Sequence, residues 1–348
     1  MLYEEAKKRI IDRVYPDFWM GEYDKYRSVM EKVDKNNIQV LTHSPGGEPV
    51  FLITYGKKEE VKSTANYNSA VAGRKPEAYM DKMSREKPVI FLLGPVHGQE
   101  VEGITGLVNF INILETGYDL DGNRRKEMES LAKKCRLVII PVGNPDGYKR
   151  FKARSLKGLE EKDVQFWGQG TWSDNSLCGW PECKRVHPMT EDKSGFLGCY
   201  FNNEGINMMH DEFFDPMALE TKAILDTVRK EGPDISVSLH SYSPPPGILR
   251  TSFVPYRVHE EIYEISKEFY SYLEEANYSH NILHEPKKEG EKFNLTSAIY
   301  HISGATSFTF ECTEGLKDDY QVSFNDVLEI QLLLYKTMME YCLKQKDI

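Results

Sequence analysis

Long apolar runs are absent from the sequence. No stretch approaches the length that spans a bilayer, and the N-terminus, MLYEEAKKRI, is charged and has no segment of the export-signal type. We therefore expect a cytoplasmic protein without a membrane partner. A basic excess is also absent, because the formal net charge is -10. Binding to nucleic acid requires a clustered basic surface, so we exclude nucleic acid as a partner.

Cysteine is scarce, with 6 residues in a chain of 348. Without an export signal these thiols are expected to be free or bound to metal. Several lie in the segment 156–204, which is rich in Gly, Trp and Cys and has no sustained periodicity. We interpret this segment as an insertion over one face of the molecule. One hypothesis is a structural zinc ion, and the alternative is free thiols. The four candidate zinc ligands are Cys178, Cys183, His187 and Cys199.

Four short apolar runs are typical of buried, largely parallel strands: VIFLLG (89–94), LVIIPVG (137–143), ISVSLHS (235–241) and SFTFEC (307–312). Helical patterns lie between them. Strands that alternate with helices predict a three-layer α/β/α sandwich with a mostly parallel, mixed central sheet. Ligands of such folds bind beyond the carboxyl ends of the strands.

The boundaries of several helices are marked by capping residues. A helix is expected to follow Glu100 and to stop at Gly117. Another is expected to begin at Asp215 and Pro216. Ser323 and Asp326 resemble a capping box that opens a long C-terminal helix. A further helix is expected over 258–269, where apolar residues share one face.

The stretch GPVHGQEVEG follows the first apolar run and places His97 and Glu100 where a strand gives way to a loop. Taken alone, this pair could be two ordinary surface residues. His240 ends another strand-like run, so its side chain is expected at the same edge of the sheet. Two His and one Glu are a set typical of catalytic zinc, with a fourth position for water. The alternative for His240 is a hydrogen-bonded core histidine.

Glu311 ends the fourth apolar run, where a carboxylate has no obvious structural role. Beside a metal ion it would suit proton transfer as a general base. The alternative is that Glu311 pairs with a buried Lys or Arg.

Four motifs in order resemble the zinc carboxypeptidases of the carboxypeptidase A type: HGQE (97–100), NPDGY (144–148), SLHSY (238–242) and TFE (309–311). The segment 38–56 also resembles the family's opening hairpin. The resemblance implies a single catalytic domain over 1–348 that contains the insertion 156–204. It also implies a zinc ion on His97, Glu100 and His240, with Glu311 as the general base.

Two further catalytic residues are suggested by the resemblance. In the family an Arg downstream of NPDG stabilises the oxyanion. Arg154 is our first choice for this role, and Lys184 and Arg185 in CKRVHP are the alternatives. Tyr300 resembles the family's mobile Tyr that closes over the substrate, although it could equally be an ordinary amphipathic Tyr.

One family feature is missing. The Asn-Arg pair that binds the substrate's terminal carboxylate is replaced in GINMMHDEFF by Met209 and His210, and Asn207 replaces the Asp that orients the first zinc His. A second placement on GCYFNNEG puts Asn202 and Asn203 there and also lacks the Arg. Substitutes for the missing cation and other substrate-binding candidates are Arg250, His210, Tyr242 and Asn207.

The sequence therefore predicts a zinc-dependent metallopeptidase or amidohydrolase that cleaves an amide bond of a peptide or acylated substrate. Because the carboxylate-binding Arg is missing, both C-terminal exopeptidase and amidase or deacylase activities remain open. The alternative from another class is a non-catalytic zinc-binding or peptide-binding protein with the same fold.

Overall fold

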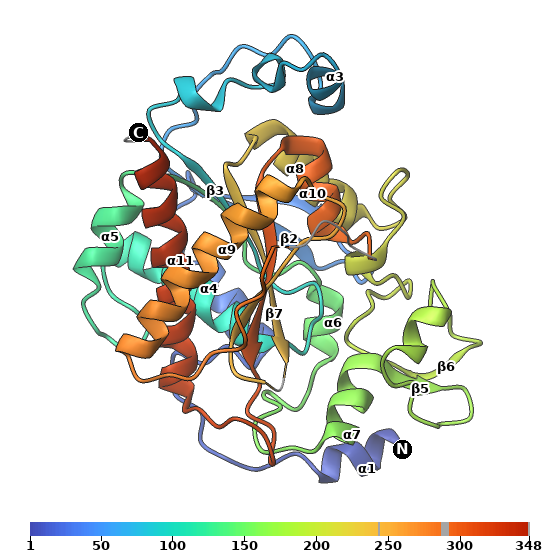
Figure 1. The fold of residues 1–348 in the computed structure, drawn as a ribbon. Helices are drawn as coiled ribbons and strands as arrows, with labels where there is room; N and C mark the ends of the chain where they lie inside the picture. Colours follow the sequence, from blue (N-terminus) through green and yellow to red (C-terminus); the bar gives the residue numbers. More distant parts are fainter. Residues whose placement is uncertain (243, 287–291, 347–348) are drawn as a thin grey trace.

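The computed structural model of the chain describes residues 1–242, 244–286 and 292–346. Figure 1 shows a central sheet with helices on both faces. The sheet has seven strands in the order β1-β2-β4-β3-β7-β9-β8. Their bounds are β1 (Ile38–His43), β2 (Pro49–Tyr55), β3 (Val89–Leu93), β4 (Arg136–Ile140), β7 (Ile235–Tyr242), β8 (Gly247–Leu249) and β9 (Thr306–Thr313).

The four apolar runs of the sequence form the middle of this sheet. β4, β3, β7 and β9 pair in parallel, whereas β1, β2 and β8 join the two edges in antiparallel orientation. The predicted mixed, mostly parallel sheet is thus confirmed. The predicted opening hairpin also corresponds to a pair of strands, β1 and β2.

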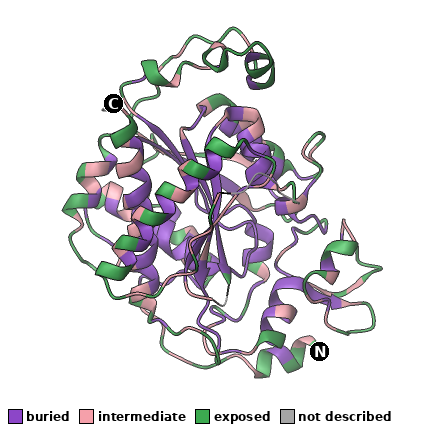
Figure 2. Cartoon of the chain, in the orientation of Figure 1, coloured by how far each residue is buried: buried purple, intermediate pink, exposed green. Residues whose placement is uncertain are grey.

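The side chains of the central strands alternate between two hydrophobic cores. In β3, Ile90 and Leu92 belong to the larger core, whereas Phe91 and Leu93 belong to the smaller core on the opposite face. This alternation follows from the period of two in a strand and explains why the runs are apolar throughout. Figure 2 shows the consequence, with buried strands in the centre and exposed residues on the outer sides of the helices.

The two cores are covered by different helices. α4 (Val101–Thr116), α9 (Tyr256–Glu275) and α11 (Phe324–Lys346) contribute to the larger core, and α8 (Leu219–Glu231) and α10 (Leu295–Ser303) contribute to the smaller one. The other α-helices of the described residues are α1 (Tyr3–Lys8), α2 (Tyr23–Met30), α3 (Tyr67–Ala72), α5 (Lys126–Ala132), α6 (Pro145–Arg150) and α7 (Glu161–Val164). No helix within the described residues combines the length and hydropathy that a membrane span requires.

Most of the predicted helix boundaries are confirmed. Gly117 ends α4 with a left-handed φ of 83°, which glycine adopts without steric cost. The predicted start at Asp215 is wrong, because α8 begins at Leu219. Asp211, four residues earlier than Asp215, accepts hydrogen bonds from the backbone N–H groups of Met217 and Ala218. These bonds hold the turn just before the helix, and the N-cap residue Ala218 makes no side-chain cap.

The predicted capping box of the C-terminal helix is confirmed. The backbone N–H of Asp326 donates to Ser323 Oγ at 3.1 Å, and the backbone N–H of Ser323 donates to Asp326 Oδ2 at 2.7 Å. These two bonds satisfy donors that would otherwise be orphaned at the start of α11.

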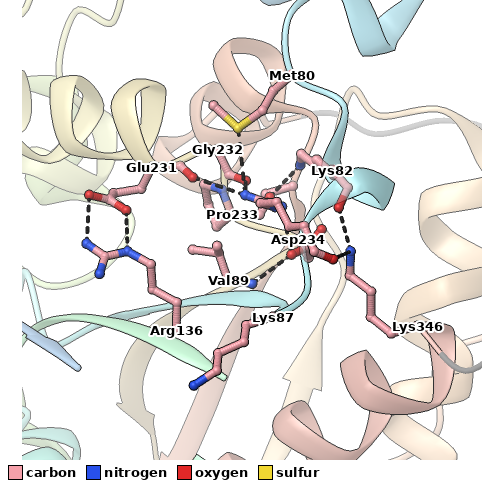
Figure 3. Close-up of polar contacts among 12 residues, drawn as sticks. Met80, Lys82, Lys87, Val89, Arg136, Glu231, Gly232, Pro233, Asp234 and Lys346 are labelled. Atoms are coloured by element: carbon pink, nitrogen blue, oxygen red, sulfur yellow. Dashed lines mark hydrogen bonds and ion pairs between the residues drawn. The ribbon is translucent and has the colours of Figure 1, made fainter. Parts of the chain in front are cut away.

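The amino edge of the sheet is fixed by paired charges (Figure 3). Asp234 accepts hydrogen bonds from the Arg85 guanidinium at 2.8 Å and from the backbone N–H of Val89 at 2.7 Å. Nearby, Arg136 and Glu231 form a bidentate pair with contacts of 2.8 and 3.1 Å. These pairs join the starts of β3, β4 and β7.

The segment 156–204 contains α7 and a two-stranded antiparallel sheet of β5 (Gly170–Trp172) and β6 (Ser194–Leu197). In Figure 1 it lies beside the N-terminal helix, next to the main sheet. Arg9 joins the two through an ion pair to the buried Asp163 at 2.6 Å. The segment thus carries its own regular structure.

Candidate metal centre

The loop that carries His97 is held against the loop that carries the NPDGY motif. A Cβ added at Gly98 would lie 2.0 Å from the backbone N of Tyr148, so this close approach requires glycine. Asn144 Nδ2 donates to the carbonyl of Val96 at 3.1 Å, and its Oδ1 accepts from the backbone N–H of Gly147 at 2.9 Å. These contacts fix the backbone just beyond the carboxyl end of β3.

Two neighbouring strands bring the other motif residues to the same edge. β7 and β9 run parallel, with His240 paired to Glu311 in register. In β7, Leu239 points into the larger core, and in β9, Phe310 does the same. Because alternate residues of a strand face opposite sides, His240 and Glu311 both point to the other side of the sheet. They therefore lie next to each other at the carboxyl edge.

Three of the predicted residues come together as a compact group. His97 Nδ1 lies 2.8 Å from Glu100 Oε1, and His240 Nδ1 lies 2.9 Å from Glu100 Oε2. One donor atom from each residue lies within 4.8 Å of the other two. All three side chains are buried, with exposed fractions of 6%, 2% and 3% for the residues in chain order.

The other ring nitrogens are held by neighbouring side chains. Asn207 Oδ1 accepts from the backbone N–H of Met209 at 3.0 Å, which identifies this atom as the amide oxygen. His97 Nε2 lies 3.3 Å from the same oxygen, so Nε2 carries the proton. His240 Nε2 lies 3.1 Å from Ser238 Oγ. This arrangement leaves the Nδ1 lone pair of His97 facing Glu100.

The geometry of this group fits a bound cation. Burial lowers the pKa of His97 against the opposing effect of Glu100, whereas Glu100 raises the pKa of His240 against the effect of burial. Glu100 Oε2 is buried and has no hydrogen-bond partner despite its 2.9 Å contact with His240. Two imidazole nitrogens and a carboxylate that converge in this way are a donor set typical of catalytic zinc. His97, Glu100 and His240 are therefore able to hold a metal ion.

Glu311 lies next to His240 on the neighbouring strand and is largely buried. Within the described part of the chain, no Lys or Arg forms an ion pair with it. Burial raises the pKa of Glu311 to about 7, with a further rise from Glu100 and opposing effects of His240 and Lys184. The alternative, an ion pair between Glu311 and a buried Lys or Arg, is therefore not found among residues 1–242, 244–286 and 292–346.

Two other predicted catalytic residues lie elsewhere. Arg154 is half-exposed and pairs with Glu22 at 3.1 Å. Tyr300 is buried and packs edge-on against Tyr67 of α3, with ring centroids 5.9 Å apart. It precedes the amino end of β9, whereas Glu311 lies near the carboxyl end. The structure brings neither Arg154 nor Tyr300 together with the three possible metal ligands.

The substrate-binding candidates are divided between several places. Arg250 follows β8 and contacts the carbonyl of Glu285. Tyr242 is 55% exposed at the end of β7, two residues beyond His240. Asn207, as described above, contacts His97. This contact corresponds to the placement on GINMMHDEFF, in which Asn207 stands where the family carries an orienting Asp.

His210 lies close to the possible metal centre, but it is not a cation there. Its Nε2 lies 2.8 Å from the Nζ of Lys184. An ammonium group only donates, so His210 Nε2 accepts and the ring is neutral. Burial, followed by the charge of Lys184, lowers the pKa of His210 to about 3. Lys184 therefore carries the positive charge at this position.

The proposed structural zinc site is not supported. His97, Glu100 and His240 form the one possible metal-binding group among the described residues. Cys178 and Cys183 pack in a small apolar cluster, whereas Cys199 lies in the larger core. His187 instead accepts a hydrogen bond from the backbone N–H of Asn207 at 2.8 Å.

Sequence reasoning missed two neighbours of the metal centre. Tyr200 stacks on His97 with a centroid distance of 3.8 Å and an interplanar angle of 7°. No sequence signal marks Tyr200, because it comes from the irregular insertion. Ser238 contacts His240 and precedes it by two residues on the same strand, so the period of two could have identified it.

Comparison with known proteins gives the same assignment as the geometry. Residues 33–348 match the profile of the family described as zinc carboxypeptidase (Peptidase_M14). The chain belongs to the zinc carboxypeptidase family. Membership marks the protein as a zinc metallocarboxypeptidase-like hydrolase, and the resemblance of its four motifs is confirmed. None of the curated proteins matches this family member in sequence.

Solved structures share the fold of this zinc carboxypeptidase at low identity. A metallo-carboxypeptidase from Burkholderia cenocepacia has a TM-score of 0.56 and 13% identity, covering 91% of this chain and 67% of that chain. Thrombin activatable fibrinolysis inhibitor has a TM-score of 0.54 and 16% identity, with coverage of 98% and 81%. The bovine form of that protein, in complex with tick carboxypeptidase inhibitor, has a TM-score of 0.50 and 18% identity. The match covers 93% of this chain and 96% of that chain. These likenesses establish the fold.

Proposed function

We propose that the protein is a zinc-dependent hydrolase that cleaves an amide bond of a peptide or acylated substrate. In this proposal His97, Glu100 and His240 hold the zinc ion, and Glu311 is the general base. A zinc ion at this position supplies Lewis-acid chemistry, which activates water and polarises a carbonyl group. The remaining chemistry belongs to side chains of the chain itself.

One observation supports the catalytic role most directly: Glu311 is a largely buried carboxyl group beside the possible metal ligands, and no Lys or Arg among the described residues forms an ion pair with it. A protein that only binds zinc has no need of this residue, because burying an unpaired carboxylate is costly. Burial raises the pKa of Glu311, and a carboxyl group with a raised pKa is suited to accept a proton and return it. Glu311 would take the proton of the attacking water and then give it to the leaving amine.

The other side chains act by holding this arrangement. Asn207 and Ser238 fix the ring orientations of His97 and His240, so that both Nδ1 atoms face Glu100. Tyr200 covers one face of His97 and excludes water from it. Arg154 is not used in this proposal, because its guanidinium pairs with Glu22.

The substrate class is an amide next to either a free C-terminus or an acyl group. Hydrolysis of peptides with free and with amidated C-termini distinguishes the two. A strict exopeptidase cleaves only the free acids, whereas an amidase or deacylase also cleaves the blocked peptides.

The decisive test replaces one oxygen of the proposed base. Glu311→Gln keeps the size of the side chain and removes its ability to accept a proton, so we expect hydrolysis to fall by about 100-fold to 10,000-fold. Zinc content, measured by elemental analysis, should remain one ion per chain. The matched control is Glu191→Gln, which changes an exposed carboxylate and should leave both quantities unchanged.

Two results would contradict the proposal. One is wild-type protein that, when loaded with zinc, hydrolyses nothing in panels of peptides, esters and acyl amides. That result would favour the non-catalytic binding protein. The other is Glu311→Gln protein with undiminished activity.

A further inference from the structure

Tyr200 connects the insertion 156–204 to one of the possible metal ligands. Its ring stacks on His97 with centroids 3.8 Å apart and an interplanar angle of 7°. Asn207 contacts His97 at a single atom, Nε2, which fixes one point of the ring and leaves its tilt free. A stacked ring fixes the plane as well. The direction of the Nδ1 lone pair, and with it the affinity for a metal ion, therefore depends on where Tyr200 is held.

Two backbone hydrogen bonds hold Tyr200 from the side of the insertion. The N–H groups of Cys199 and Tyr200 donate to the carbonyls of Trp167 and Gly168, at 2.8 and 2.9 Å. Both acceptors belong to η3 (Gln165–Gln169), a single turn of π-helix. Such turns are rare and are found frequently at functional sites. The position of Tyr200 therefore follows the position of η3.

The N-terminal helix α1 packs against η3 and lies beside α7 in Figure 1. Trp167 of η3 is 0% exposed, and Tyr3 of α1 packs edge-on against it, with centroids 6.0 Å apart and an interplanar angle of 74°. Tyr3 also contacts Phe196 of β6, with a centroid distance of 5.7 Å. The helix thus closes the aromatic core of the insertion.

Arg9, directly after α1, makes a second contact with the insertion. Its guanidinium donates hydrogen bonds to Oδ1 and Oδ2 of Asp163, at 2.6 and 2.8 Å. The Asp163 side chain is 0% exposed and lies in α7, two residues before η3. A buried carboxylate needs a compensating partner, and a bidentate arginine supplies both charge and a fixed geometry. Arg9 therefore anchors the short helix that continues into η3.

We propose that Arg9 and Tyr3 are positioning residues of the metal centre. They hold η3, and through it Tyr200, so that the ring of His97 presents Nδ1 to the metal ion. Both residues lie before residue 33, where the match to the family profile begins, so the profile does not include them. The inference rests on the zinc site of the proposed function, but it does not require that the protein cleaves an amide.

Zinc affinity, measured by competition with a chelator, tests the inference without any substrate. We expect Tyr200→Ala and Arg9→Ala each to weaken zinc binding by about 10-fold, because each change releases the ring of His97. Tyr200→Phe keeps the stacked ring and should bind zinc like the wild type. If Arg9 acts through Tyr200, the two losses do not add. The double variant should then also lose about 10-fold, rather than about 100-fold.

The matched control is Arg125→Ala. Arg125 pairs with Asp119 at 2.8 Å, and the Asp119 side chain is 0% exposed. This change therefore also leaves a buried carboxylate without its arginine, and it should lower the free energy of unfolding as Arg9→Ala does. Zinc affinity should stay unchanged, because Arg125 lies outside the insertion and α1. A general loss of stability would instead affect zinc binding in both variants alike.

A second readout reports the arrangement of the ligands directly. With Co²⁺ bound in place of zinc, the visible absorption bands depend on the geometry of the ligands. The bands of Tyr200→Ala and Arg9→Ala should shift in the same direction from those of the wild type, whereas Arg125→Ala should show no shift. Tyr3→Leu removes the edge-on contact with Trp167 and keeps an apolar side chain, so it gives the same test if Arg9→Ala does not fold.

The inference is overturned if Arg9→Ala binds zinc as tightly as the wild type, or if the losses add in the double variant. It is also overturned if Arg125→Ala loses as much zinc affinity as Arg9→Ala. Failure of the proposed function looks different. In that case the zinc-loaded wild-type protein hydrolyses no amide, or Glu311→Gln keeps its activity, while the differences in zinc affinity persist.

Discussion

The two edges of the central sheet treat buried charge in opposite ways. At the amino edge, Asp234 has Arg85 as its partner, and Glu231 has Arg136. At the carboxyl edge, Glu311 has no cation in ion-pair contact within the described residues, and Glu100 faces two imidazole rings instead of a guanidinium. The central strands therefore begin beside carboxylates that are paired with arginines. They end beside carboxylates that have no arginine or lysine in ion-pair contact among the described residues.

This difference distinguishes structural charge from functional charge. Buried charges that are paired and hydrogen-bonded fix the ends of strands. Removing one member of such a pair leaves the other as a buried charge without compensation. A buried charge without a partner costs stability and is retained where a ligand completes it. The unpaired charges at the carboxyl edge lower the free energy of unfolding. Binding of a metal ion and a substrate there would raise it again.

The largest expected effect tests the carboxyl edge. His240→Ala removes one of three metal ligands, and we expect loss of bound zinc together with a fall in hydrolysis on the order of 1,000-fold or more. The melting temperature of the metal-free protein should fall, because His240 is buried and its removal takes away one of the two imidazole partners of Glu100. Elemental analysis, a peptide assay and calorimetry give the three readouts. A variant that retains zinc would break the comparison.

The next effect tests the amino edge. Asp234→Ala leaves Arg85 without its partner, and the Arg85 side chain is only 2% exposed. We expect a loss of about 3 kcal/mol in the free energy of unfolding, measured with urea, and unchanged zinc binding. Asp226→Ala is the matched control, because Asp226 pairs with Lys222, whose side chain is 60% exposed. That change should cost less than about 1 kcal/mol.

A smaller effect concerns the support of the metal ligands. Asn207→Ala removes the oxygen that contacts His97 Nε2, so the ring loses its fixed orientation. We expect zinc affinity to fall by about 10-fold to 100-fold, as measured by competition with a chelator. Asn203→Ala is the control, since the side chain of Asn203 contacts Arg150 instead. Equal affinities in the two variants would show that Asn207 does not orient the ring.

The smallest effect concerns a buried acid outside both edges. Burial raises the pKa of Glu220 from its ordinary 4.5 to about 7. The folded state therefore binds more protons than the unfolded state between these values, and stability falls as the pH rises through them. Glu220→Gln should stabilise the protein by about 2 kcal/mol at pH 8 and by much less at pH 5. Urea unfolding at the two pH values measures this, with Glu191→Gln as the exposed control. A pH-independent effect would contradict the assignment.

Much of the fold follows from local sequence patterns. The four apolar runs, the glycine stop at Gly117 and the capping box of Ser323 and Asp326 each depend on residues close in the chain. The predicted start at Asp215 failed for the opposite reason. The helix there has Ala218 as its N-cap and no side-chain cap, and the carboxylate that holds the preceding turn belongs to Asp211.

The site shows the same division. His97, Glu100, His240 and Glu311 could be predicted because each follows an apolar run, and parallel strands end at one edge. The position of the Arg154 side chain could not be predicted in this way, because no strand or helix pattern fixes the direction of a side chain on a loop. Its guanidinium turned out to pair with Glu22.

The sequence by itself determined where the apolar runs lie along the chain. It also determined the family motifs and the residue types that can bind zinc. Only the tertiary structure decided that Lys184 rather than His210 carries the charge beside them, and that Tyr200 stacks on His97. The physical reason is range. Backbone periodicity acts over a few residues, whereas burial and Coulomb forces act between side chains that folding brings together.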